Sequence, residues 1–307
     1  MVNRSLARFA WLNLAYNLLV VAWGAYVRAT GAGAGCGEHW PLCNGQVIPR
    51  EPQLETIVEF THRLTSGLAL VLVVIMYVWA RRAFAKGHRT RRAAGWSTVL
   101  MIIEALIGAG LVLFALVADD ESMARAVSLA LHLVNTFLLL GAITLTAWFA
   151  GGRPGFSIRG AGTAGRMLAS AALATIIVGA SGAIIALGDT LIAAALRGGR
   201  SALSPMVQFL LEVRVAHPVL AVAVAIGVVA MVIWLEGRAD NNEARPFGML
   251  LIALFAGQIV VGLVNVSLGA PVWIQLVHLL LADMVWIALV LYGAARLAVS
   301  PRAAASA

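Results

Sequence analysis

Residues 126–149 read AVSLALHLVNTFLLLGAITLTAWF, an apolar run without Asp, Glu, Lys or Arg in which His132 is the ionisable side chain. A helix needs about 20 apolar residues to cross the hydrocarbon core of a bilayer, which is about 30 Å thick. The run therefore predicts a transmembrane helix. Ionisable side chains are costly at that depth, and they usually mark a function.

Seven further apolar runs have a similar length. The chain is 61% hydrophobic and only 12% charged, a composition that soluble domains rarely have. We therefore predict an all-α integral membrane protein with eight transmembrane helices. The first run also resembles a signal peptide, but no small-residue cleavage site follows it, so we interpret it as a retained helix. The other predicted spans are 10–29, 62–80, 95–117, 167–187, 212–235, 248–268 and 273–296.

The formal charge of +8 is distributed unevenly along the chain. If the N-terminus lies in the cytoplasm, the inner segments hold 15 of the 22 basic residues. Cytoplasmic loops of membrane proteins carry such an excess of Lys and Arg, so both termini are predicted to be cytoplasmic. Basic residues interleaved with aromatic ones, or a known binding module, would indicate nucleic acid, and neither occurs. We expect a lipid membrane and no nucleic acid as partner.

Each even-numbered span carries one histidine: His62, His132, His217 and His278. These spans run from outside to inside, so all four histidines belong to the outer leaflet. Three are predicted five or six residues into their helices, roughly 8–9 Å deep at 1.5 Å per residue, and His62 lies in a helix that starts near Leu54. A single membrane histidine is usually a packed core residue. Four at matching depth instead predict two bis-imidazole sites for haem iron.

The spacing of these histidines indicates a tandem duplication. His217 follows His62 by 155 residues, and His278 follows His132 by 146 residues. The segment EALIG that begins at Glu104 resembles QIVVG, which begins 154 residues later. Each half holds four helices, so both halves have the same orientation and form two pseudo-symmetric four-helix bundles related by an axis along the membrane normal.

The duplication sets the expected domain boundaries. The N-terminal half covers residues 1–150, the C-terminal half covers residues 167–307, and a cytoplasmic linker at 151–166 joins them. A homo-oligomer is compatible with this arrangement.

The first half carries carboxylates beside its first histidine. Glu55, Glu59 and His62 are spaced i, i+4, i+7 and share a helical face, and Arg63 can pair with Glu59. A carboxylate one turn from a haem ligand can transfer protons or stabilise positive charge that develops during an oxidation. The alternative for both acids is a structural one, in which they complement the dipole at the start of a helix.

The second half lacks this arrangement. Arg214 and Pro218 flank His217, and the nearest acid is Glu212. This asymmetry predicts that the N-terminal half binds a substrate and that the C-terminal half holds a permanent cofactor.

Four further polar residues are weaker candidates. Arg28 can meet a haem propionate or extend to lipid headgroups, and Gln275 can bond to His278 or to a propionate. Glu104 and Asp283 are deep acids that can relay protons or stay neutral and hydrogen-bonded.

The two cysteines, Cys36 and Cys43, share the first outer loop. An outward-facing compartment is oxidising, which favours a disulfide. Two free thiols and a zinc site with His39 are the alternatives, although a fourth zinc ligand is not apparent.

These residues together resemble the haem A synthase family. The matching pieces are GAYVRATG from Gly24 to Gly31, the cysteine pair, EFTHR from Glu59 to Arg63, and the three later histidines. The resemblance extends over nearly the whole chain. Some relatives carry a second cysteine pair in the outer loop before the sixth span, but residues 188–211 contain none, so its role cannot be transferred.

The resemblance implies an oxidoreductase that converts the C8 methyl group of haem O to the formyl group of haem A for haem–copper oxidases. It implies His62 and His132 as axial ligands of the substrate haem and His217 and His278 as ligands of a haem B. Glu59 would match the family's essential acid, and the cysteine pair would match its loop disulfide.

The resemblance also implies a location and partners. We expect a bacterial-type plasma membrane with the haem sites toward the outer face. The expected partners are haem O synthase (protohaem farnesyltransferase) and haem–copper oxidase assembly factors. A bis-histidine cytochrome b that only transfers electrons and a non-enzymatic haem carrier are the alternatives.

Overall fold

The computed structural model describes residues 2–118, 120–158, 161–197, 204–239 and 242–298. Arg159 and Arg302, two of the basic residues predicted on the inner side, lie outside these ranges. Within them the chain is helical, without strands beyond two isolated bridges. The elements are α1 (Arg4–Thr30), η1 (Ala32–Ala34), α2 (Leu54–Ala83), α3 (Arg89–Leu113), α4 (Met123–Ala150), α5 (Gly162–Arg197), α6 (Pro205–Val213), α7 (Ala216–Glu236), α8 (Arg245–Ser267) and α9 (Val272–Arg296).

Eight of these helices are long and apolar enough to span a membrane, when α6 and α7 are taken together as Pro205–Glu236. This result confirms the predicted all-α class and the number of spans. Most helices extend beyond the predicted apolar runs because polar residues form their ends. Asn3, for example, caps α1 by accepting a hydrogen bond at Oδ1 from the N–H of Leu6 at 3.0 Å.

The sixth span differs from the prediction. It is two helices, α6 and α7, which meet at Arg214 and Val215, and His217 is the second residue of α7 instead of the fifth or sixth. Pro218 explains the break. Proline has no N–H to donate to the carbonyl four residues earlier, and its ring clashes with that carbonyl in a continuous helix.

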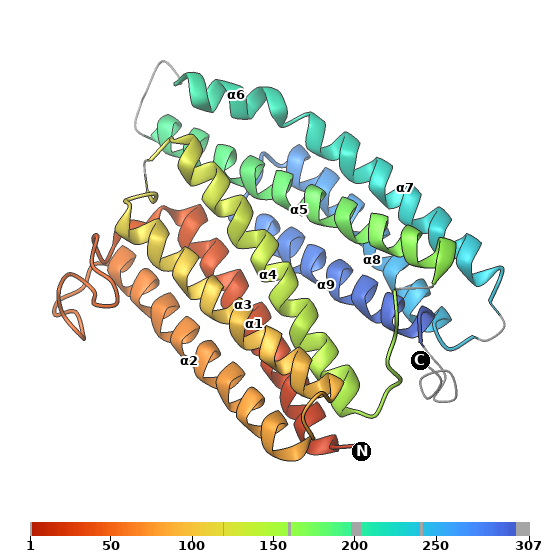
Figure 1. Ribbon diagram of the computed structural model, residues 1–307. Coiled ribbons are helices and arrows are strands. Elements are labelled where there is room, and N and C mark those ends of the chain that lie inside the picture. Colours follow the sequence, from red (N-terminus) through yellow and green to blue (C-terminus); the bar gives the residue numbers. More distant parts are fainter. Residues whose placement is uncertain (1, 119, 159–160, 198–203, 240–241, 299–307) are drawn as a thin grey trace.

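The helices of each half pack on their sequence neighbours, and four of them join the halves (Figure 1). Helices α4 and α1 both contact α5 and α9. At this junction Phe137 of α4 stacks on Trp286 of α9 with ring centroids 5.5 Å apart, and the Trp286 indole N–H donates to the Phe137 carbonyl. Gly141 makes room for the indole ring, since a Cβ there would lie 3.2 Å from Trp286 Nε1.

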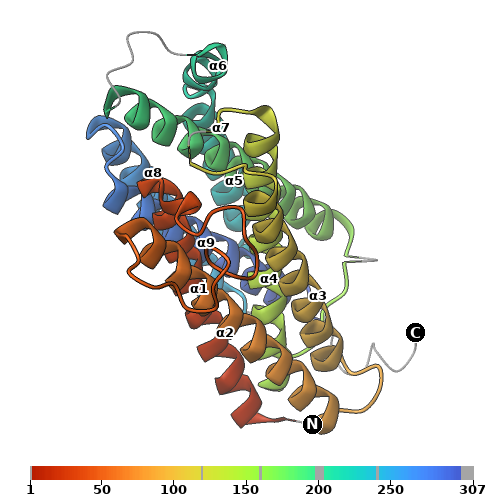
Figure 2. The same ribbon diagram turned by 90° about the vertical axis from the view of Figure 1, so that its left-hand side faces the viewer.

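The two ends of the bundle are built differently. Near the start of α1, the N–H of Asn3 donates to the Ala150 carbonyl at the end of α4, at 2.9 Å. The N–H of Ser157 likewise donates to the Leu297 carbonyl after α9, at 3.3 Å. At the opposite end, the long loop between α1 and α2 lies over the ends of these helices, toward the viewer in Figure 2.

Candidate functional site

The first pair of histidines lies within the N-terminal half. His62 lies on α2 and His132 lies on α4, and the two imidazoles are close enough for their charges to interact. The His62 ring packs against α1 at Gly24, where a Cβ would come within 2.9 Å of His62 Cε1. The other ring faces α3, with His132 Nδ1 at 3.2 Å from Glu104 Oε1. Four different helices therefore contribute to this site.

The second pair repeats the arrangement in the C-terminal half. His217 lies on α7 and His278 lies on α9, and these two imidazoles are also close enough for their charges to interact. Ser181 Oγ of α5 lies 2.8 Å from His217 Nδ1. Glycines again stand beside both rings, since a Cβ at Gly182 would lie 3.1 Å from His217 Cε1 and a Cβ at Gly262 would lie 3.0 Å from His278 Cε1.

The residues of both sites fit a flat iron macrocycle. Nδ1 of His62 and Nδ1 of His278 are buried without a hydrogen-bond partner in the described part of the chain. The same part contains no cluster of three or more His, Cys, Asp or Glu side chains that could hold a bare metal ion. A haem needs only two axial protein ligands, because the porphyrin supplies the other four. The glycines let three of the imidazole rings pack directly against the neighbouring helices.

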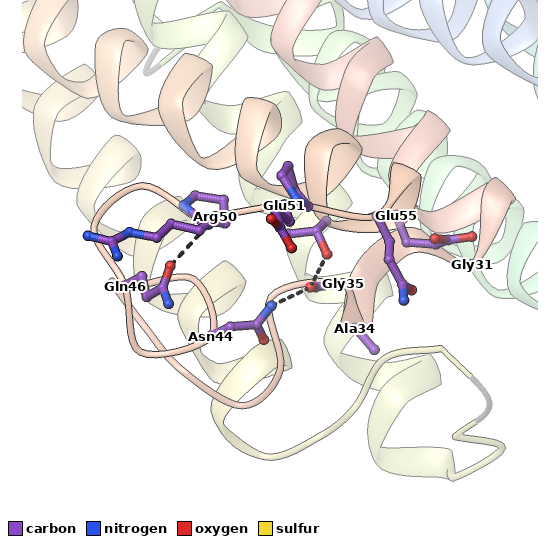
Figure 3. A pocket seen from close by; sticks show the side chains of 12 residues that line it. Gly31, Ala34, Gly35, Asn44, Gln46, Arg50, Glu51 and Glu55 are labelled. Atoms are coloured by element: carbon purple, nitrogen blue, oxygen red, sulfur yellow. Dashed lines mark hydrogen bonds between the residues drawn. The ribbon is translucent and has the colours of Figure 1, made fainter.

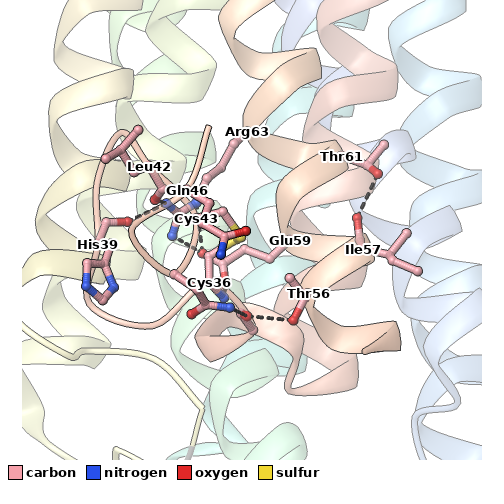
Figure 4. The surroundings of a disulfide bond; sticks show 12 residues. Cys36, His39, Leu42, Cys43, Gln46, Thr56, Ile57, Glu59, Thr61 and Arg63 are labelled. Carbon is pink, nitrogen blue, oxygen red and sulfur yellow. Dashed lines mark hydrogen bonds and ion pairs between the residues drawn. A yellow bond between two sulfur atoms is a disulfide. The ribbon is translucent and has the colours of Figure 1, made fainter. Parts of the chain in front are cut away.

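Glu59 is almost completely buried, with 3% of its surface exposed, and it is held from two sides (Figure 4). Its Oε2 accepts a hydrogen bond from the N–H of Cys36 at 2.8 Å. Its Oε1 accepts from Arg63 Nε at 3.0 Å, and the two side chains form an ion pair. The predicted pairing of Glu59 with Arg63 is therefore present, and the carboxylate is fixed beneath the loop, one helical turn from His62.

Arg63 ties the same loop to α2. Its Nη1 donates to the carbonyls of His39 at 2.5 Å and Leu42 at 2.7 Å. These carbonyls belong to the segment closed by the disulfide between Cys36 and Cys43, whose Cα atoms are 4.4 Å apart. The disulfide is present, so these cysteines are neither free thiols nor zinc ligands.

Gly35 allows the loop to reach the helix. A side chain at this position would overlap the backbone of Glu55. Thr56 Oγ1 and Asn44 Nδ2 both donate to the Gly35 carbonyl, at 2.7 Å and 3.1 Å. These contacts bring the N–H of the following residue, Cys36, to the Glu59 carboxylate.

Glu55 is exposed and does not join Glu59 (Figure 3). It lines an open polar pocket of about 520 Å³ together with Asn44, Gln46, Arg50 and Glu51. Glu55 and Glu59 both lie on α2, four residues apart, as predicted. The loop between α1 and α2 covers only Glu59 and leaves Glu55 exposed. The structure therefore separates Glu55 from the histidine site.

Arg28 lies between the two halves. Its Nη1 donates to the Ala186 carbonyl and to Thr190 Oγ1, both at 2.5 Å, and its Nη2 donates to Gln275 Oε1 at 3.1 Å. Ala186 and Thr190 belong to α5, and Gln275 belongs to α9. Arg28 therefore bridges the two halves through Gln275, a contact that the sequence did not predict. The amide of Gln275 donates to the Ala270 carbonyl at 2.6 Å instead of to His278.

We expect Arg28→Gln to destabilise the junction between the halves by roughly 2–4 kcal/mol, because hydrogen bonds to charged groups contribute about 1.5–3 kcal/mol each and buried partners are left unsatisfied. The measurement is thermal unfolding in detergent. Arg8→Gln, on the exposed part of the same helix, is the control and should leave the midpoint nearly unchanged. Equal midpoints for the two variants would contradict the bridging role.

Two further acids lie on α3 and α9. Glu104 is partly exposed and is held by α4, and Asp283 is fully buried with neither carboxylate oxygen hydrogen-bonded among the described residues. Ser181 and Gly182 were not predicted as site residues, and Gly24 was noted only as part of a family motif. The two glycines are 158 residues apart, close to the repeat offset, and this spacing was the available signal.

Comparisons with known proteins show which family the chain resembles. The family model described as cytochrome oxidase assembly protein, COX15-CtaA, matches residues 7–290. The chain is 48% identical over 284 residues to a Thermus thermophilus protein named protoheme IX farnesyltransferase, a match that covers 92% of this chain and 47% of that protein. The chain thus spans about half the length of this curated relative.

Proteins named heme A synthase match shorter parts of the chain. The protein from Shouchella clausii is 42% identical over 113 residues, which are 37% of this chain and 38% of that protein. The protein from Halalkalibacterium halodurans is 37% identical over 155 residues, which are 50% of this chain and 49% of that protein. By the match of the family model to most of its length, the chain belongs to the COX15-CtaA family of cytochrome oxidase assembly proteins.

Proposed function

We propose that this chain is a haem A synthase, an integral membrane oxidoreductase that converts the C8 methyl group of haem O to a formyl group. Family membership and the relatives named heme A synthase support this function. The single observation that carries it is the buried Glu59 carboxylate, fixed by Cys36 and Arg63 one turn from His62. Electron transfer or haem carriage alone does not need such a group.

The N-terminal half binds the substrate in this proposal. His62 and His132 are the axial ligands of haem O, and Gly24 allows the His62 ring to pack against α1. Conversion of the methyl group, through an alcohol and then a hydrated aldehyde that loses water, adds one oxygen atom and removes four electrons in two steps, so an oxidant from outside the chain must receive these electrons. The Glu59 carboxylate stabilises positive charge that develops on the reacting methyl carbon of haem O, and it can also accept the proton released. Arg63 keeps the carboxylate oriented.

In the C-terminal half, His217 and His278 would hold a resident haem B. When bound, this haem supplies one-electron redox chemistry next to the substrate site. Ser181 orients the His217 ring through its Nδ1 atom. Arg214, which forms an ion pair with Asp189 at 3.4 Å, replaces the carboxylate that Glu59 provides in the first half.

We propose that the halves are pseudo-symmetric, with α1–α4 corresponding to α5–α9. The contacts between the halves support this relation. Exchanging the halves converts the α1–α9 contact into the α5–α4 contact, and both are present. With cytoplasmic termini, the loop that carries the disulfide and both histidine pairs lie toward the outer face of the membrane.

The proposed partners follow from the substrate. The Thermus thermophilus relative is about twice as long as the matched segment and is named for a farnesyl transfer, which supports a haem O synthase as supplier of haem O. Haem A would pass to haem–copper oxidase assembly, consistent with the family description.

The experiment is expression of the chain in a membrane that contains haem O, followed by chromatography of the extracted haems. Haem A should appear only when the chain is present. Unchanged haem O, with haem still bound to the protein, would instead indicate a cytochrome b or a haem carrier.

We expect Gly24→Val to reduce haem occupancy of the N-terminal half by roughly tenfold or more, because overpacking costs about 1–3 kcal/mol. The new Cβ would press on the His62 ring. Gly67→Val on α2 is the control, since a Cβ there meets nothing within 4 Å. The haem-to-protein ratio of the purified variants measures the effect. Equal occupancy in both variants would show that Gly24 does not limit the site.

A further inference from the structure

The two histidine pairs differ in one contact. In each half this contact joins the second histidine to a residue of the helix before it in the chain. In the N-terminal half, His132 Nδ1 lies 3.2 Å from Glu104 Oε1 of α3. In the C-terminal half, His278 Nε2 lies 3.4 Å from Gln258 Nε2 of α8. Both partners reach the histidine of the following helix. One half thus places a carboxylate beside Nδ1 of its second histidine, and the other half places a neutral amide beside Nε2.

The Glu104 carboxylate is fixed by α4. Asn135 Nδ2 donates to Glu104 Oε2 at 2.5 Å and also to the Leu100 carbonyl of α3 at 2.9 Å. Thr136 Oγ1 donates to Glu104 Oε1. By contrast, Gln258 Oε1 has no hydrogen-bond partner among the described residues. The carboxylate is therefore built into the site, while the amide is held only loosely.

We propose that Glu104 is a positioning residue that increases electron donation from His132 to the iron of the haem held in the N-terminal half. The inference rests on the proposed function, because it takes His132 as an axial ligand. The contact has the right distance but is not aligned as a hydrogen bond. Coordination through Nε2 fixes the ring and leaves Nδ1–H as the donor toward Glu104.

The chemistry follows from the charge of the acceptor. A carboxylate that accepts the Nδ1–H of a metal-bound imidazole makes this ligand more basic. A more basic axial ligand stabilises the oxidised iron and so lowers its reduction potential. The neutral Gln258 cannot do this for His278. The asymmetry gives the N-terminal iron the lower potential, so an electron passes favourably from the N-terminal iron, which is oxidised, to the C-terminal iron, which is reduced.

The test compares Glu104→Gln with Glu104→Asp in the full chain loaded with haem O and haem B. Glu104→Gln removes the charge beside His132 Nδ1, and Glu104→Asp keeps a carboxylate on a shorter side chain. Potentiometric titration followed by optical absorption gives one reduction potential for each half. His62→Ala and His217→Ala assign the two transitions, because each removes one site. Glu104→Gln should raise the N-terminal potential and leave the C-terminal potential in place. Glu104→Asp should raise the N-terminal potential by less.

Several outcomes overturn the inference. If haem stays bound and Glu104→Gln leaves the N-terminal potential unchanged, Glu104 has only a structural role. If both potentials shift equally in either variant, the effect is not transmitted through the adjacent imidazole. If Glu104→Gln fails to retain haem, Glu104→Asp decides alone, because its shorter side chain moves the carboxylate away from His132 Nδ1, and an unchanged N-terminal potential refutes the inference. Failure of the unaltered chain to bind haem would reject the proposed function instead.

Discussion

Glu59→Gln is expected to leave both haem groups bound and to lower haem A formation by about 10²–10⁴-fold, the usual contribution of a positioned acid or base. The amide keeps an oxygen that can accept the Cys36 N–H, so the loop should remain in place. It cannot neutralise Arg63 or accept a proton. The measurement is the ratio of haem A to haem O in extracts, together with the haem-to-protein ratio.

A matched control distinguishes the effect of losing the Glu59 charge from the effect of losing any carboxylate near the start of α2. Glu55→Gln changes the carboxylate one turn earlier, which is exposed and lines the polar pocket (Figure 3). Its haem A output should equal that of the unaltered chain. Normal output from Glu59→Gln, or an equal loss in both variants, would contradict the role proposed for Glu59.

The number of spans was predictable because a bilayer requires a long apolar run for each helix. The break in the sixth span was not predicted, since a mean over a long window averages Arg214 and Pro218 with the apolar residues around them. Its cause is a missing backbone donor, which a composition window does not detect. Pro218 itself was the available signal, because proline inside a helical run usually bends or ends the helix.

The chemistry of the site was predictable where it depends on local spacing. Arg63 follows Glu59 by four residues, and the ion pair is present. The second anchor of Glu59, the N–H of Cys36, was not predictable, because it depends on how the loop folds back onto α2 through Gly35. Arg28 is a similar case. Its partners Ala186 and Gln275 are more than 150 residues away, and no local pattern connects them.

The second large effect concerns the haem B proposed for the C-terminal half. His217→Ala is expected to remove haem B from the C-terminal half and to lower the haem-to-protein ratio by about half, since each site depends on two axial ligands. His62→Ala should instead remove the haem of the N-terminal half. Extracted haems identify which group is lost, because haem O and haem B separate on chromatography.

A graded control distinguishes ligand loss from general misfolding of the C-terminal half. Ser181→Ala removes only the hydroxyl near His217 Nδ1 and keeps the imidazole. Loss of such a partner typically weakens binding by about 10–100-fold, less than loss of the ligand itself. Ser181→Ala should therefore retain haem B at high supply, whereas His217→Ala should not. If His217→Ala keeps a full complement of haem B, or if His62→Ala removes the same haem, then the histidines do not act as one pair in each half.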